Sequence, residues 1–165
     1  MIAADRPIQR PARAKLLVVD KTGNIQHWLR TRLLDVLRPG DIVIANDAAT
    51  LPASLQGQHL RSGRFIEVRL AGRRSFVPDF VHHFLAIVFG SGDFRVRTED
   101  RVLPPALAAG DRLALGPLRA TIEAMLNHPR LIQLAFEGAP DEIWNGLARH
   151  GRPIQYSHVP TLLAL

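Results

Sequence analysis

The sequence predicts an α+β protein in which a small α/β unit carries an inserted antiparallel β-barrel-like domain. Two observations predict this class. Before about Gln56, strand-length apolar runs alternate with a helical pattern, as in an α/β unit. After Gln56 the pattern changes to short alternating runs separated by turns, as in a small antiparallel barrel or sandwich. We therefore predict one domain from residues 1–56 with 151–165, and an inserted domain from residues 57–150.

The elements of the first part follow from local signals. Residues 15–20 form a continuous apolar run of strand length, and residues 21–24 read as a turn. Between residues 27 and 37 the apolar side chains recur at helical spacing, and Pro39-Gly40 ends that pattern. Residues 41–45 are then predicted to form a short buried strand.

The inserted domain is predicted from six strands and one helix. The expected strands are residues 65–70, 84–89, 94–98, 112–115, 119–125 and 131–136. Residues 75–83 could be helix or loop. A helix begins at Pro140, has Asp141 and Glu142 in its first turn, and ends before Gly151.

Composition narrows the function classes. The 165 residues include no cysteine, which excludes disulfides and cysteine-based zinc sites. The start has no signal-peptide pattern, and no apolar run approaches the ~18 residues of a membrane span. We therefore expect a cytoplasmic protein that contacts no membrane. The net charge of +6 suggests an acidic partner such as nucleic acid. The arginines are spread along the chain, however, so a compositional bias is the better explanation of the charge when it is taken alone.

The most specific stretch runs from Leu37 to Leu70. It reads Leu-Arg-Pro-Gly-Asp-Ile-Val-Ile-Ala-Asn-Asp-Ala-Ala-Thr-Leu-Pro-Ala-Ser-Leu, and later Ser-Gly-Arg-Phe-Ile-Glu-Val-Arg-Leu. This order resembles the N-terminal part of the S-adenosylmethionine:tRNA ribosyltransferase-isomerases of queuosine biosynthesis. The family pattern is roughly Leu-x-Pro-Gly-Asp, two hydrophobic residues, x-Asn-Asn/Asp-Thr-Arg-Val, a hydrophobic residue and Pro-Ala-Arg-Leu. A Gly-Gly-x-hydrophobic-Glu-hydrophobic-Leu segment follows it.

Further matches keep the same order along the chain. Residues 13–20 resemble the family's Ser-Arg-Leu-Leu-x-hydrophobic-Asp strand, and residues 111–116 resemble a later Gly-hydrophobic-x-hydrophobic stretch. The segment from Gly151 falls where the family has Gly-x-x-Pro-Leu-Pro-Pro-Tyr-Ile. The resemblance covers about the first half of a family member, so we expect a truncated chain whose partner is the missing C-terminal half of the same protein.

The chain also departs from the family pattern. Ala48 and Ala49 stand where the family has Thr and Arg, Ser54 stands at a second Arg position, and His158 stands at the Tyr position. Arginine binds phosphate or carboxylate through two parallel hydrogen bonds, which alanine and serine cannot do. The departures therefore indicate a diverged paralogue with another substrate.

The resemblance implies a reaction, a co-substrate and a partner. Family members transfer and isomerise the ribosyl part of S-adenosylmethionine onto 7-aminomethyl-7-deazaguanine in tRNA, giving epoxyqueuosine, and no metal is implied. S-adenosylmethionine is then the co-substrate and tRNA the partner. Whether this span is an enzyme stays open, and we expect it to be inactive alone. The alternative is a non-catalytic RNA- or protein-binding β-barrel module.

Candidate site residues are few, and each has a structural alternative. Asn46 and Asp47 end a predicted strand, where ligand contacts are common, although both residues also favour turns. Tyr156 and His158 lie in the segment that replaces a family motif. No catalytic residue is identified. Glu67 could act in catalysis or pair with an arginine across its strand, and the adjacent His82 and His83 make a poor metal site.

Overall fold

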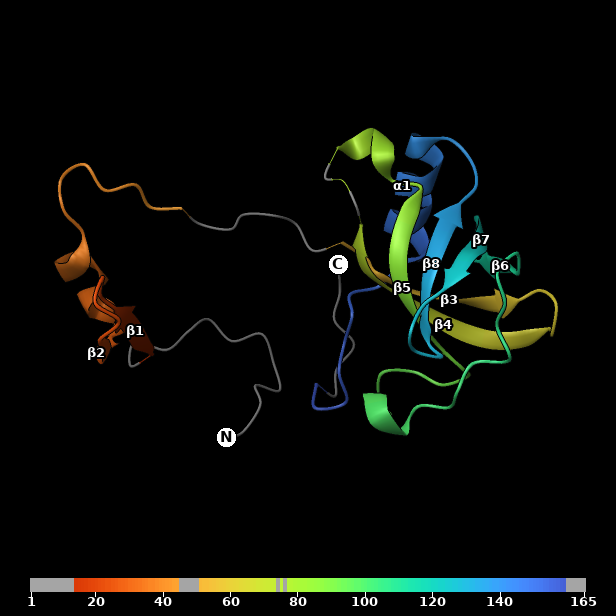
Figure 1. The fold of residues 1–165 in the computed structure, drawn as a ribbon, viewed down its shortest axis with the longest axis horizontal. Helices are drawn as coiled ribbons and strands as arrows, with labels where there is room; N and C mark the ends of the chain where they lie inside the picture. The colour runs from red at the N-terminus through yellow and green to blue at the C-terminus, as the bar shows by residue number, and fades with distance from the viewer. Residues whose placement is uncertain (1–13, 45–50, 74, 76, 160–165) are drawn as a thin grey trace. The chain divides into compact units, whose positions relative to one another are not determined.

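The computed structural model describes residues 14–44, 51–73, 75 and 77–159 (Figure 1). The chain divides into two compact units, Met1–Ala48 and Ala49–Leu165. The fold is α+β and mostly β, with a two-stranded sheet in the first unit and a closed antiparallel barrel in the second. The barrel-like domain expected from the sequence is confirmed. The discontinuous domain predicted from residues 1–56 and 151–165 stays a prediction.

The described part of the first unit is a β-hairpin followed by a short helix. Strands β1 (Lys15–Val19) and β2 (Ile25–Leu29) pair antiparallel, which confirms the strand predicted at 15–20. The Asp20 carboxylate closes the turn, because it accepts hydrogen bonds from the backbone N–H groups of Thr22 and Asn24. The helix predicted over 27–37 is wrong in its first part, which pairs with β1. The remainder is the 3₁₀ helix η1 (Arg30–Val36).

The strand predicted at 41–45 is wrong where the structure describes it. Residues 41–44 form no strand, and Ile42 and Ile44 are 87% and 91% exposed. Asp41 instead closes a turn, since its carboxylate accepts a hydrogen bond from the backbone N–H of Arg38 at 2.7 Å. An apolar run predicts burial only where another apolar surface covers it, and none of the described residues of the first unit covers this run.

The second unit is a six-stranded barrel in which every pairing is antiparallel. Its strand order is β3-β4-β5-β8-β7-β6, and β6 pairs with β3 to close the ring (Figure 1). The strands are β3 (Ser54–His59), β4 (Arg64–Arg73), β5 (His83–Phe89), β6 (Arg112–Leu115), β7 (Leu118–Met125) and β8 (Leu131–Phe136).

Alternating apolar residues of all six strands fill the barrel. Helix α1 (Pro140–His150) packs against β7 and contributes Ile143 and Leu147 to this core. Gly146 lets the helix approach, because a Cβ there would lie 2.3 Å from Leu118 Cδ2. The fully buried residues of the strands include Leu55, Val68, Ala86, Val88, Leu113, Leu115, Ala120, Ile122, Ile132 and Leu134.

Closure of the ring explains a strand that the sequence did not reveal. β3 contains Gly57 between two glutamines and lacks a clear apolar alternation. A Cβ at Gly57 would lie 2.0 Å from the carbonyl oxygen of Ala114 on β6, so glycine is required where the two strands meet. Register shifts in β4 and β7 supply further bending.

The structure of the loops decides the predictions for residues 94–98 and 75–83. The strand predicted at 94–98 is wrong, because these residues form turns that lead into the 3₁₀ helix η3 (Thr98–Asp100). The undecided region 75–83 contains the 3₁₀ helix η2 (Pro78–Phe80) and the start of β5. The other five predicted strands and the helix at Pro140 are confirmed within one to three residues.

Candidate functional site

A polar pocket of about 270 Å³ lies on the barrel unit where three distant segments meet. The segments are the paired strands β3 and β4, the loop that follows β5, and the end of α1 with the chain after it. Ser54 and Glu67 come from the strands, and Asp93 comes from the loop. The other lining residues are Gln56, Phe94, Arg95, Arg149, His150, Gly151, Arg152, Pro153 and Gln155.

Backbone hydrogen bonds hold the third segment against the barrel. Ser54 and Arg152 exchange two of them, each 2.9 Å long, in an isolated antiparallel bridge. The His150 Nε2–H also donates to the carbonyl oxygen of Gln56 at 2.7 Å. The C-terminal end of α1 is thereby held beside the start of β3, where it forms a wall of the pocket.

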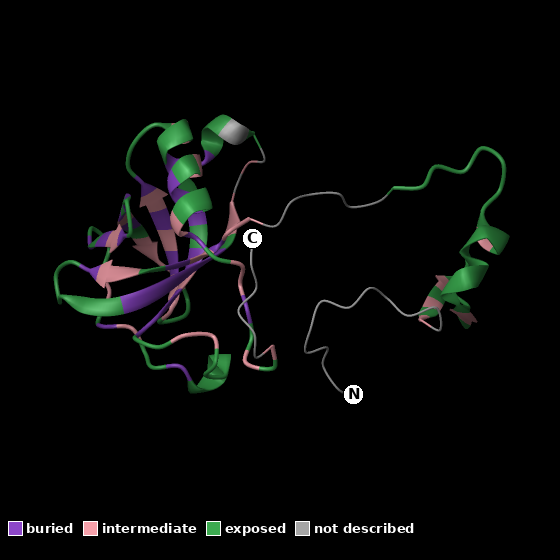
Figure 2. Cartoon of the chain, turned by 180° about the vertical axis from the view of Figure 1, so that it is seen from behind, coloured by how far each residue is buried: buried purple, intermediate pink, exposed green. Residues whose placement is uncertain are grey.

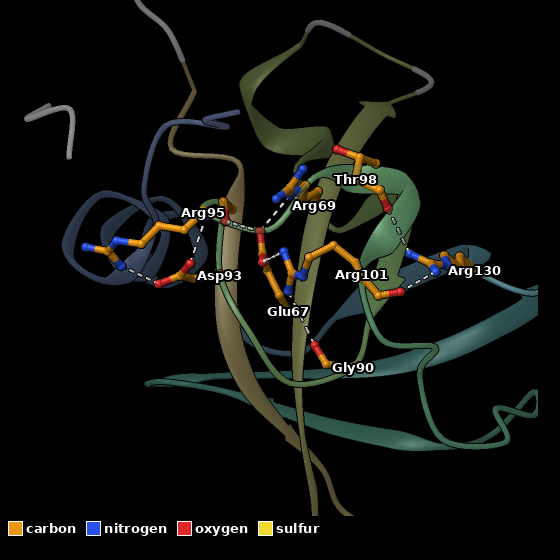
Figure 3. Close-up of polar contacts among 9 residues, drawn as sticks. Glu67, Arg69, Gly90, Asp93, Arg95, Thr98, Arg101 and Arg130 are labelled. Atoms are coloured by element: carbon orange, nitrogen blue, oxygen red, sulfur yellow. Dashed lines mark hydrogen bonds and ion pairs between the residues drawn. The ribbon is translucent and has the colours of Figure 1, made fainter. Parts of the chain in front are cut away.

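Glu67 forms the charged floor of the pocket and is almost completely buried. Its Oε1 accepts hydrogen bonds from Arg69 Nε at 2.6 Å and from Ser54 Oγ at 2.9 Å. Its Oε2 accepts one from Arg101 Nη1 at 2.6 Å. Figure 3 shows the carboxylate between the two guanidinium groups. The cross-strand pairing that the sequence suggested for Glu67 is thus replaced by pairing along its own strand and with a distant loop.

Three guanidinium groups near Glu67 pack against one aromatic ring, that of Phe89. The Cζ atoms of Arg69, Arg101 and Arg130 lie 4.7, 5.0 and 5.0 Å from the centroid of the Phe89 ring. Arg130 also donates from Nη2 to the carbonyl oxygen of Arg101 at 2.6 Å (Figure 3). These contacts hold the loop after β5 in place, and this loop carries Asp93 to the pocket.

The cluster keeps Glu67 ionised. Burial by itself raises the pKa of the Glu67 carboxyl, but the hydrogen bonds and charges of Arg69 and Arg101 outweigh burial and lower it below its usual value. Both carboxylate oxygens accept hydrogen bonds from cations. Glu67 is therefore a fixed negative charge rather than a group ready to take up a proton.

The structure describes only part of the predicted site. Asn46 and Asp47, like Ala48 and Ala49, lie outside the described residues. Tyr156 and His158 are exposed, and their rings stack with centroids 5.9 Å apart. Neither lines the pocket, although Gln155 of the same segment does. Their role in binding a substrate stays a prediction.

The adjacent histidines take separate partners. His82 Nε2 lies 2.9 Å from the carbonyl oxygen of Gly138, and His83 Nδ1 lies 3.1 Å from a Glu123 carboxylate oxygen. No group of three or more potential metal ligands occurs among the residues that the structure describes. In the same residues, no helix has the length and apolarity needed to cross a membrane.

Sequence reasoning missed several residues of the pocket. Asp93 lies in a loop whose path no periodic pattern reveals, and Arg149 was assigned only to the end of a helix. The one available signal was the family pattern itself. Ser54, Glu67 and Gly151 fall in three separate segments of that pattern, and all three line this pocket.

The sequence of the chain matches a family of known proteins. The family described as "Queuosine biosynthesis protein" matches residues 1–160. The S-adenosylmethionine:tRNA ribosyltransferase-isomerase of Clostridioides difficile is 38% identical over 73 residues, which are 44% of this chain and 21% of that protein. Its namesake from Thermosynechococcus vestitus is 29% identical over 150 residues, 90% of this chain and 37% of that protein. The S-adenosylmethionine:tRNA ribosyltransferase-isomerase of Desulfotalea psychrophila is 30% identical over 89 residues, which are 53% of this chain and 25% of that protein.

These matches cover between about a fifth and somewhat more than a third of the relatives' own lengths. The family match, in contrast, runs over nearly all of this chain and includes both units. The chain therefore belongs to the queuosine biosynthesis protein family.

Proposed function

We propose that this chain is the N-terminal portion of an S-adenosylmethionine:tRNA ribosyltransferase-isomerase, the name that its matched relatives carry. In this role it helps to hold S-adenosylmethionine, the ribosyl donor, and tRNA, the acceptor, in the cytoplasm. The remainder of the catalytic site comes from further chain. Residues 1–56 and 151–165 then belong to an α/β domain that this further chain completes, with the barrel inserted into it.

One observation carries the proposal. Ser54, Glu67 and Gly151 come from three segments of the family pattern that are separated by up to 97 positions, yet they line one pocket. A purely structural module has no need to gather these segments around a polar hollow. A site for a polar substrate does need it, because few and precisely placed polar groups orient a ligand.

The geometry also limits what the pocket does in catalysis. Ribosyl transfer and isomerisation require a group that removes a proton beside the sulfonium of S-adenosylmethionine. Glu67 does not fit that role, because its pKa is lowered and both of its oxygens are held by arginines. We assign it instead to positioning the pocket wall, and the proton acceptor to the further chain.

A non-catalytic RNA-binding module is the second candidate. The observation that favours it is Ser54 at the pocket, where the family pattern has arginine. Arg69, which lies opposite Ser54 in the β3–β4 register, supplies Glu67 with a guanidinium. The carboxylate is therefore still neutralised, but the pocket lacks a guanidinium at position 54 that could pair with an anionic group.

A chimera distinguishes the two candidates. This chain replaces the matched segment of the Thermosynechococcus vestitus relative, and adenine release and epoxyqueuosine are followed by mass spectrometry with tRNA that carries the aminomethyl-deazaguanine base. We expect turnover by the chimera and none by the 165-residue chain alone, because half a site cannot hold the reactants within the roughly 1 Å that catalysis tolerates. A folded chimera that binds tRNA without turnover would establish the binding module.

A further inference from the structure

The rim of the pocket carries three arginines from two segments. Arg95 lies in the loop after β5, Arg149 in the last turn of α1, and Arg152 just beyond that helix. Arg95 forms an ion pair with Asp93. Arg149 and Arg152 are exposed, and neither side chain has an ion pair or hydrogen bond within the described part of the chain.

The carboxylates of the pocket are already neutralised by other cations. Glu67 forms ion pairs with Arg69 and Arg101, and Asp93 forms one with Arg95. The charges of Arg149 and Arg152 are therefore uncompensated at the pocket mouth. Arg149 also lies at a helix C-terminus, where a positive charge is mildly favourable. That placement explains one of the two arginines and leaves Arg152 unexplained.

The ligand that fits this rim is an anion that presents two oxygen atoms side by side to a guanidinium group. A guanidinium binds a phosphate through two parallel hydrogen bonds, which gives both strength and orientation. The pocket, at about 270 Å³, lies just below the range of about 300–1,000 Å³ typical of sites that enclose whole small molecules. It has room for one phosphate and the sugar attached to it, while the rest of a larger ligand stays outside.

We propose that Arg149 and Arg152 bind the phosphodiester backbone of an RNA strand at the mouth of this pocket. The proposal rests on the proposed function, because tRNA is known only from the names of the relatives. The inference adds a binding site to the proposed function: one arginine at the end of α1 and one just beyond that helix, rather than charge spread over the chain, position the RNA on the barrel unit.

Binding of a fluorescein-labelled tRNA transcript to the 165-residue chain tests this site, with fluorescence anisotropy at 50, 100 and 200 mM NaCl. The variant Arg149→Gln/Arg152→Gln removes both side chains. The control Arg38→Gln/Arg64→Gln removes the same charge from exposed positions that do not line the pocket. Melting curves of both variants verify that the barrel remains folded.

We expect the pocket variant to bind about 10-fold more weakly at 50 mM NaCl and to lose about one to two units of the salt slope, since each phosphate contact contributes roughly 0.7–0.9. The control should change affinity less than about 3-fold. Equal weakening by both variants, or no change in either, would overturn the site. Displacement of the RNA by polyglutamate as readily as by unlabelled tRNA would also overturn it, in favour of an acidic protein segment.

The charge-preserving variant Arg149→Lys/Arg152→Lys separates paired hydrogen bonding from charge alone. We expect it to recover less than half of the lost affinity, and complete recovery would contradict phosphate binding by the guanidinium fork. Turnover by the chimera described above is independent of these results. An active chimera with unchanged RNA binding in the pocket variant rejects this site alone, whereas an inactive chimera with the expected binding loss rejects the catalytic function alone.

Discussion

The barrel unit buries a continuous apolar core, whereas none of the described residues of the first unit is buried. Figure 2 shows the buried positions in the barrel strands and α1, and only exposed or intermediate ones along β1, β2 and η1. In the first unit Leu17, Val19 and Ile25 are more than half exposed. A two-stranded hairpin is marginally stable without an apolar surface to cover it.

The difference teaches that the two units depend differently on the rest of the protein. The barrel supplies its own core and needs nothing further to fold. The described part of the first unit has apolar side chains suited to a core, but none of its own described residues buries them. In the proposed enzyme, the remaining part of the α/β domain provides the surface that buries them. The folding of the first unit should therefore depend on whether the further chain is present.

The largest effect expected within the barrel comes from its buried ion cluster. Glu67→Gln leaves the buried guanidiniums of Arg69 and Arg101 without a counter-charge, which should cost about 3–5 kcal/mol of the free energy of unfolding. Glu137→Gln, which breaks the exposed pair with Arg112, should cost less than about 1 kcal/mol. Urea denaturation followed by Trp144 fluorescence, with Trp28→Phe as background, measures both. Equal costs would mean that the barrel is not closed around Glu67.

Removal of one leucine from each unit sharpens the comparison. Leu134→Ala, at a fully buried position of β8, should cost about 2–5 kcal/mol. Leu34→Ala, at a position that is 77% exposed in η1, should change the same transition by less than about 0.5 kcal/mol. A large effect of Leu34→Ala on the barrel transition would show that the two units fold together and would break the comparison.

A smaller effect is expected from acid, through Asp111. The hydrogen bonds from Arg61 and from the Ala108 backbone N–H, with the His59 ring 3.0 Å away, outweigh burial and hold the pKa of the Asp111 carboxyl well below the usual range. A carboxyl whose pKa is depressed by folding stabilises the protein above the unfolded value of about 4, and this stabilisation is lost as the pH falls below it. The melting temperature of the chain should therefore fall between pH 6 and pH 3.

The variant Asp111→Asn isolates that contribution. It should melt lower than the parent chain at pH 7 and should lose less on acidification, as measured by differential scanning calorimetry at each pH. An identical pH dependence in parent and variant would assign the acid sensitivity to other carboxyls.

Local pattern predicted the regular barrel strands and α1, because alternation and helix-end signals are properties of neighbouring residues. It failed where the outcome depends on distant partners. β3 was missed because Gly57 is dictated by the approach of β6. Residues 41–45 were predicted buried from their own apolarity alone. The pairing of Glu67 with Arg101 joins positions 34 apart through an irregular loop, so nothing in either segment predicts it.

Amide hydrogen exchange measured by mass spectrometry tests the central claim most directly, in the 165-residue chain and in the chimera with the Thermosynechococcus vestitus relative. The barrel strands should be protected in both proteins, because the barrel supplies its own core. The peptides of β1 and β2 should exchange at rates near those of an unfolded chain in the 165-residue protein, and should become protected only in the chimera. Strong protection of β1 and β2 in the 165-residue chain, or none in an active chimera, would contradict the account.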